Sequence, residues 1–244
     1  MSNQIKSVLL PGSFFNIESK RKIQYLNQKE INTLYLFDHT LNPLNKKDDM
    51  YEIKKSVFEL ENYKDRLFNI GTLILNINKR NSEKLFYDYL DPFLEIKNFK
   101  LGLGTGDNKF EEMKVNYQNE IDEVIKKLLK SNTFSIDGNN LFLGGNSKSK
   151  LNLIRKYSLG INQWEISKMN LEIKSEIYKK IKNPIGNLSQ CIHIGEKNYF
   201  KNFDLNIELI YILKDSSLDQ FYNQIQNILD DKIEYDWLTF WYCN

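Results

Sequence analysis

The chain has 244 residues, and its 34 basic and 32 acidic side chains leave a formal net charge of +2. This near balance provides no electrostatic basis for binding nucleic acid or an anionic membrane, and no stretch approaches the roughly 18 to 20 apolar residues of a membrane helix. Because the N-terminus carries no targeting signal, we expect a cytoplasmic protein with one domain over residues 1–244. The two cysteines lack CxxC spacing, which argues against a zinc site or a disulfide framework.

Short apolar runs alternate with amphipathic helical patterns along the whole chain. The runs that we predict as strands are 6–10, 31–37, 69–75, 99–103, 140–143, 161–166, 205–213 and 233–242. The helical patterns between them are 17–29, 50–63, 82–95, 110–129, 148–157, 168–181 and 216–229. Strict alternation of this kind predicts a parallel sheet, and eight strands predict an α/β fold of the closed (β/α)₈ or TIM-barrel type.

The C-terminal part of this predicted barrel is unusual. The chain ends soon after the eighth predicted strand, 233–242, so we expect an abbreviated C-terminal part with no final helix. A further apolar run, 191–194, has no place in the series and is interpreted as an extra strand or an insertion.

Glycines and small polar residues recur where the predicted strands end, which is the face of a (β/α)₈ barrel that carries function. After the first five strands and within or at the end of the sixth, these residues are Pro11, Gly12, Ser13, Asp38, His39, Asn76, Asn78, Gly104, Thr105, Gly106, Asp107, Gly144, Gly145, Asn146, Ser147 and Trp164. The loop after the fourth strand has GxGxG spacing rather than GxGxxG, so it does not favour a dinucleotide-binding fold.

Five motifs, taken in series, resemble the bacterial-luciferase-like superfamily of flavin-dependent monooxygenases over residues 5–166. They are LYLFDHTL at 34–41, IGTLIL at 70–75 with Arg80, LGLGTG at 101–106, Gly144-Gly145, and Asn162-Gln163-Trp164. The resemblance implies a luciferase-like barrel that holds reduced FMN, or a deazaflavin in a sister branch, and that oxidises a small organic substrate. It also implies a homodimer or heterodimer and a flavin reductase as a partner.

The resemblance assigns cofactor contacts to residues along this rim. Leu73-Ile74 takes the place of a non-proline cis peptide against the flavin ring, and Asn76 approaches the polar edge of the ring. By the same resemblance, the backbone amides of Gly144, Gly145 and Asn146 and the Ser147 hydroxyl bind the phosphate, since a helix N-terminus offers unpaired N–H groups. The remaining cofactor positions are Gly104, Thr105, Gly106 and Trp164.

His39 and Asp107 are the candidates for proton chemistry. A histidine can hold or deliver a proton during oxygenation by a flavin, or to the hydroxyl of a deazaflavin-enzyme substrate. Each has a structural alternative, because His39 also fits a hydrogen-bonded turn and Asp107 also fits a helix cap. His193 is interpreted as structural, and the basic cluster that starts at Lys148 as a solvated helix face, with Lys148 itself available to a phosphate.

Two departures from the family pattern keep three functions open. The segment between Gly106 and the fifth strand is short, and Leu159 stands where an aspartate is usual. A short segment provides less of a lid to keep water from the reaction. The chain therefore fits a compact monooxygenase, a flavin-binding homologue without turnover, or a partner subunit of a heteromeric monooxygenase.

Overall fold

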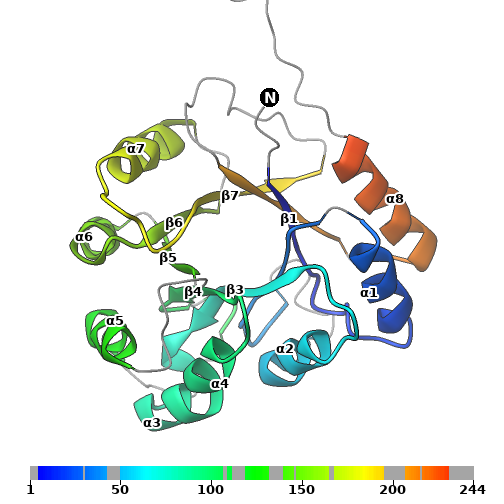
Figure 1. The fold of residues 1–244 in the computed structure, drawn as a ribbon, viewed down its shortest axis with the longest axis horizontal. Coiled ribbons are helices and arrows are strands. Elements are labelled where there is room, and N and C mark those ends of the chain that lie inside the picture. The colour runs from blue at the N-terminus through cyan, green and yellow to red at the C-terminus, as the bar shows by residue number, and fades with distance from the viewer. Residues whose placement is uncertain are drawn as a thin grey trace, which may run out of the picture.

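Eight parallel strands form a closed barrel in chain order, and the last strand pairs with the first (Figure 1). The structure is a computed structural model that describes residues 5–29, 31–42, 50–106, 109–111, 119–131, 140–145, 147–164, 168–194, 207–214 and 216–230. The strands are β1 Lys6–Leu9, β2 Thr33–Leu36, β3 Asn69–Asn76, β4 Lys100–Gly104, β5 Asn140–Gly144, β6 Gly160–Gln163, β7 Leu188–His193 and β8 Glu208–Ile212. The predicted (β/α)₈ barrel is confirmed.

Helices surround the barrel and join its strands (Figure 1). They are α1 Ser19–Asn27, α2 Ile53–Glu61, α3 Ser82–Leu85, α4 Asp91–Leu94, α5 Ile121–Lys130, α6 Lys148–Tyr157, α7 Lys168–Lys179 and α8 Leu218–Asp230. A π-helical turn, Phe86–Leu90, joins α3 to α4, so the single helix predicted at 82–95 consists of consecutive segments. A 3₁₀ turn, Ile77–Lys79, follows β3. None of the described helices is long and apolar enough to cross a membrane.

The strands bury both of their faces, which is why the sequence shows short apolar runs rather than alternation. Outward residues such as Leu34, Leu101 and Ile161 pack against the helices. Inward residues such as Tyr35 and Phe142 fill the barrel. The helices contribute the matching faces, as in α8, where Phe221, Ile225 and Ile228 are buried at the expected i, i+4, i+7 spacing.

The amino-terminal end of the barrel interior is polar and closed. Glu208 accepts hydrogen bonds from Lys100 at 2.9 Å, from Ser7 at 2.5 Å and from Tyr35 at 3.2 Å. Burial, with the adjacent Glu208 carboxylate, raises the pKa of Tyr35. A fully satisfied network of this kind holds four strands together and leaves the opposite end of the barrel for function.

The last two strands differ from the sequence prediction. The run at 191–194 overlaps β7, and the run predicted as the seventh strand is β8. Because α8 follows β8 and packs beside α1 (Figure 1), the expectation of a barrel without a final helix was wrong. The predicted strand 233–242 lies outside the described residues. Only the second half of β7 was recognised, as an extra strand or an insertion at 191–194, because the first half buries the polar Ser189 and Gln190, which interrupt the apolar run.

Candidate functional site

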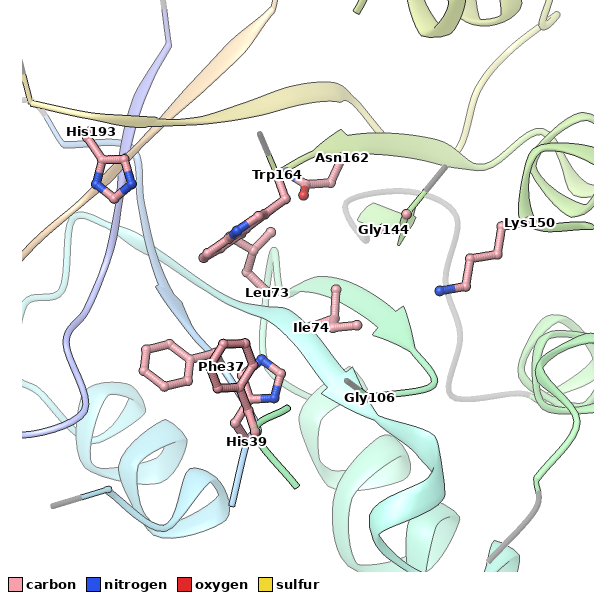
Figure 2. A pocket seen from close by; sticks show the side chains of 12 residues that line it. Phe37, His39, Leu73, Ile74, Gly106, Gly144, Lys150, Asn162, Trp164 and His193 are labelled. Carbon is pink, nitrogen blue, oxygen red and sulfur yellow. The ribbon is translucent and has the colours of Figure 1, made fainter. Parts of the chain in front are cut away.

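A cavity of about 470 Å³ opens where strands β2 to β7 end (Figure 2). It is lined by Phe37, His39, Leu73, Ile74, Gly106, Phe110, Gly144, Gly145, Lys150, Asn162, Trp164 and His193. Side chains from successive strand ends converge on this one space, which is where (β/α)₈ barrels carry their sites.

Leu73 and Ile74 form an apolar platform in the middle of the cavity (Figure 2). The pairing of β3 with β4 shifts between Thr72 and Leu75, and the Leu73–Ile74 peptide is cis, at the position that the family resemblance implies. Ile74 packs directly over Gly104, where a Cβ would lie 1.6 Å from the Ile74 Cδ1. Gly104 therefore supports the platform from behind, because its lack of a side chain leaves the space that Ile74 occupies.

A buried ion pair orders the rim between β2 and β3. Asp38 accepts hydrogen bonds from both guanidinium nitrogens of Arg80, at 2.7 and 3.1 Å, from Lys79 at 3.1 Å, and from the backbone N–H of Asn76 at 3.1 Å. Arg80 also stacks on Tyr89, with its Cζ 3.9 Å from the ring centroid. Burial disfavours the charge of Arg80, but the contacts with Asp38 outweigh it and raise the Arg80 pKa. The residue before His39 is thus immobilised.

His39 forms a hydrogen-bonded pair with Glu111 at the cavity wall. Its Nδ1 lies 2.8 Å from Glu111 Oε1, and the side chains are 17% and 15% exposed. Thr40 donates its hydroxyl to Oε2 of the same carboxylate at 3.0 Å. The imidazole ring also packs near Phe110, with centroids 5.3 Å apart. This arrangement can accept or deliver a proton, because an imidazole that lines a cavity is backed by a carboxylate.

The opposite end of the cavity is positively charged. Lys150, in the first turn of α6, extends its ammonium toward the space between Gly144 and Gly106 (Figure 2). Gly145 adopts φ +98°, and a Cβ there would lie 3.1 Å from Lys150 Nζ, so a glycine makes room for the ammonium. Burial lowers the pKa of Lys150. Ser147 caps α6 by accepting a hydrogen bond from the Lys150 N–H.

A second lysine lies behind this end of the cavity. Lys174 of α7 is buried and donates to the backbone carbonyl of Asn162 at 2.8 Å. Burial, and to a smaller extent the neighbouring charge of Lys150, lower the Lys174 pKa to about 8. Lys150 lines the cavity and Lys174 lies behind it, so the α6 end favours an anionic group.

Most of the residues predicted from the sequence come together here. Those that line the cavity are His39, Leu73, Ile74, Gly106, Gly144, Gly145 and Trp164, the last 42% exposed. Three predicted residues lie near it without lining it: Gly104 supports Ile74, Ser147 caps α6, and Asn76 is buried beneath Gly106 with its side chain accepting from the Asn78 N–H. Thr105 is exposed. Asp107 and Asn146 lie outside the described residues.

The sequence prediction of the site missed several lining residues. Phe37, Asn162 and His193 come from strand ends, and their position after or within a strand was the available signal. His193 in particular lines the cavity, whereas its apolar neighbours favoured a purely structural interpretation. Lys150 comes from the first turn of α6, and Glu111, which contacts His39 rather than the cavity itself, comes from the loop after β4. No local pattern marks them, because only folding brings them to the rim.

Comparison with known proteins supports the barrel architecture. Neither the family models nor the curated proteins that were compared with the sequence give a match. Among solved structures, one that matches is a type II Baeyer–Villiger monooxygenase, the oxygenating constituent of 3,6-diketocamphane monooxygenase from the CAM plasmid of Pseudomonas putida, in complex with FMN. The TM-score is 0.50 at 11% identity, over 80% of this chain and 69% of that chain. At this identity the likeness defines the fold class, a (β/α)₈ barrel.

Proposed function

We propose that this protein is a flavin-dependent monooxygenase that binds FMN in the cavity and uses its reduced form to oxidise a small organic substrate. The observation that carries the proposal is the division of the cavity into an apolar platform, Leu73 and Ile74, and a cationic end at Lys150. FMN has the same division, since a flat ring system is joined to a phosphate. The FMN complex of the oxygenase with a similar fold supports this choice of ligand.

The residues present fit such a cofactor. The ring would lie against Leu73 and Ile74, and the phosphate would be held by the backbone near Gly145, the first turn of α6 and the Lys150 ammonium. When bound, reduced FMN supplies the two electrons with which molecular oxygen is activated. The chain supplies the rest: aromatic side chains such as Phe37, Phe110 and Trp164 line the space and limit water.

His39 is the residue that we propose to exchange a proton with the reacting group. It lines the cavity, and its Nδ1 is taken up by Glu111, which leaves Nε2 for a ligand. Asp107 remains a prediction from the sequence. We further propose that a separate flavin reductase supplies the reduced cofactor, since the fold neighbour is the oxygenating constituent of a monooxygenase.

Titration of the purified protein tests this proposal. FMN, reduced FMN, riboflavin and a deazaflavin coenzyme are added separately, and binding is followed by calorimetry. Tight binding of FMN with weaker binding of riboflavin is expected, because only FMN carries the phosphate. Selective binding of the deazaflavin would instead indicate a deazaflavin-dependent oxidoreductase. If no flavin binds, the proposal is refuted.

A variant of His39 then separates a catalyst from a binder. Changing His39→Ala removes the imidazole without altering the platform or the cationic end, so FMN affinity should remain within about threefold while turnover is lost. Unchanged turnover with a verified substrate would contradict the role of His39. Binding without turnover in the unmodified protein would instead favour the non-catalytic homologue or partner subunit.

A further inference from the structure

Glu111 and its neighbour Phe110 are joined to the loop after β2 by more than one contact. The His39 Nδ1 lies 2.8 Å from one carboxylate oxygen, and the Thr40 hydroxyl donates to the other at 3.0 Å. The backbone is tied as well, since the N–H groups of Thr40 and Leu41 donate to the Phe110 carbonyl at 3.2 and 2.9 Å. The loop after β2 and the loop after β4 are therefore held together through the Glu111 carboxylate and through the backbone beside it.

The charge of Glu111 determines where the shared proton lies. Burial favours the neutral acid, but hydrogen bonds from His39 and Thr40, with the nearby charge of Lys79, lower the Glu111 pKa below its ordinary value. The carboxylate is thus ionised at neutral pH and can only accept hydrogen bonds. The hydrogen between the two groups must belong to Nδ1 of His39.

We propose that Glu111 is a positioning residue that holds neutral His39 as its Nδ1–H tautomer and so presents Nε2 to the cavity as a proton acceptor. A neutral imidazole in water favours the other tautomer, in which Nε2 carries the hydrogen. Glu111 reverses this preference, because an ionised carboxylate 2.8 Å away requires a donor at Nδ1.

The tautomer gives the site a direction of proton transfer. A ligand X–H bound in the cavity loses its proton to Nε2: the X–H bond breaks, an Nε2–H bond forms, and the electron pair stays on X. The resulting imidazolium is stabilised by Glu111, which stays ionised throughout. This catalytic meaning rests on the proposed function, whereas the tautomer itself follows from the contacts of His39 alone.

Nitrogen NMR on the intact chain measures the tautomer directly. The sequence contains two histidines, so ¹⁵N-histidine labelling gives two imidazole spin systems, and a His193→Gln variant assigns them. For the neutral imidazole of His39, we expect a protonated Nδ1 and an unprotonated Nε2. An Nε2–H tautomer for His39 in the unmodified protein overturns the proposal, and this result requires no change to His39 or Glu111.

Substitution of Glu111 provides the second measurement. Glu111→Gln replaces an acceptor with an amide that can donate to Nδ1, so the Nε2–H tautomer should appear; an unchanged His39 spectrum overturns the proposal. Glu111→Asp keeps the charge and should retain Nδ1–H in part. Glu120→Gln is the matched control, because Glu120 is an exposed glutamate in the same connection and should change nothing.

Flavin titration distinguishes a failure of this inference from a failure of the proposed function. If His39 carries the Nδ1–H tautomer but no flavin binds, the proposed function fails and the positioning role stands. If FMN binds and the tautomer is Nε2–H, the reverse holds. Where both hold, Glu111→Gln should lower kcat by about 100-fold while FMN affinity is retained, and Glu111→Asp should recover part of that loss.

Discussion

Arg80 donates hydrogen bonds to both carboxylate oxygens of Asp38, at 2.7 and 3.1 Å. Asp38 is the residue immediately before His39 in the chain. Both side chains of the ion pair are buried, and the backbone of Asn76 joins them: its N–H donates to Asp38, and its carbonyl accepts from Arg80 at 3.1 Å. This pair links the end of β2 to the turn after β3. It therefore fixes two walls of the cavity, although neither Asp38 nor Arg80 is among the residues that line it.

Breaking that pair should destabilise the whole barrel. Arg80→Met leaves the buried Asp38 carboxylate with Lys79 as its remaining cationic partner among the described residues, so we expect a loss of about 3 kcal/mol in the free energy of unfolding, measured by denaturant titration. Lys179→Met, which removes an exposed ion pair with Glu176, should cost less than about 1 kcal/mol. Equal losses for the two variants would mean that the buried ion pair stabilises the fold no more than the exposed one does.

Substitutions at Gly104 of β4 and Gly144 of β5 should affect different properties, the first stability and the second FMN binding. Gly104→Ala places a methyl group 1.6 Å from the Ile74 Cδ1, so the platform must move, and unfolding should become easier by about 1 to 3 kcal/mol. Gly144→Ala meets Ile74 only at an ordinary 3.5 Å, but its methyl group enters the cavity. That variant should keep its thermal stability and lose FMN affinity. A Gly104→Ala protein as stable as the unmodified one would show that Ile74 does not pack directly over Gly104.

Lys150 should discriminate between FMN and riboflavin. Removing its ammonium in Lys150→Gln should weaken FMN by about 10- to 100-fold, the contribution of a charge-assisted hydrogen bond, and leave riboflavin unchanged. Lys148→Gln is the matched control, since Lys148 is exposed in the same helical turn and should alter neither affinity. Calorimetry measures all the constants, and equal losses for FMN and riboflavin would exclude a phosphate contact at Lys150.

Lys174 should make stability depend on pH in the alkaline range. Its pKa is about 8 in the folded protein and 10.5 as the ordinary value, so the unfolded chain binds the proton more tightly. Folding is therefore penalised below pH 8, and the penalty disappears as pH rises from 8 to 10.5. The stability of the unmodified protein should rise in this range relative to Lys174→Met. If the free energy of unfolding changes with pH in the same way for both proteins across that range, the burial of this charge is contradicted.

Much of this architecture could be predicted from local patterns. Apolar runs such as 99–103 and amphipathic stretches such as 148–157 determined the alternation that identifies a (β/α)₈ barrel. The placement of His39, Gly144 and Trp164 at one rim then followed, because parallel strands end on the same side. The sequence by itself therefore determined the fold class and most of one wall of the cavity.

Other features were decided only by the tertiary structure. β7 is a strand because its neighbours β6 and β8 complete its hydrogen bonds, although Ser189 and Gln190 break its apolar pattern. Glu111 contacts His39, which lies 72 positions earlier in the sequence. Lys150 lines the cavity because the start of α6 is placed beside the ends of the neighbouring strands. Hydrophobic periodicity reports which face of an element is buried. It carries no information about which polar groups the closing of the barrel brings within hydrogen-bonding distance.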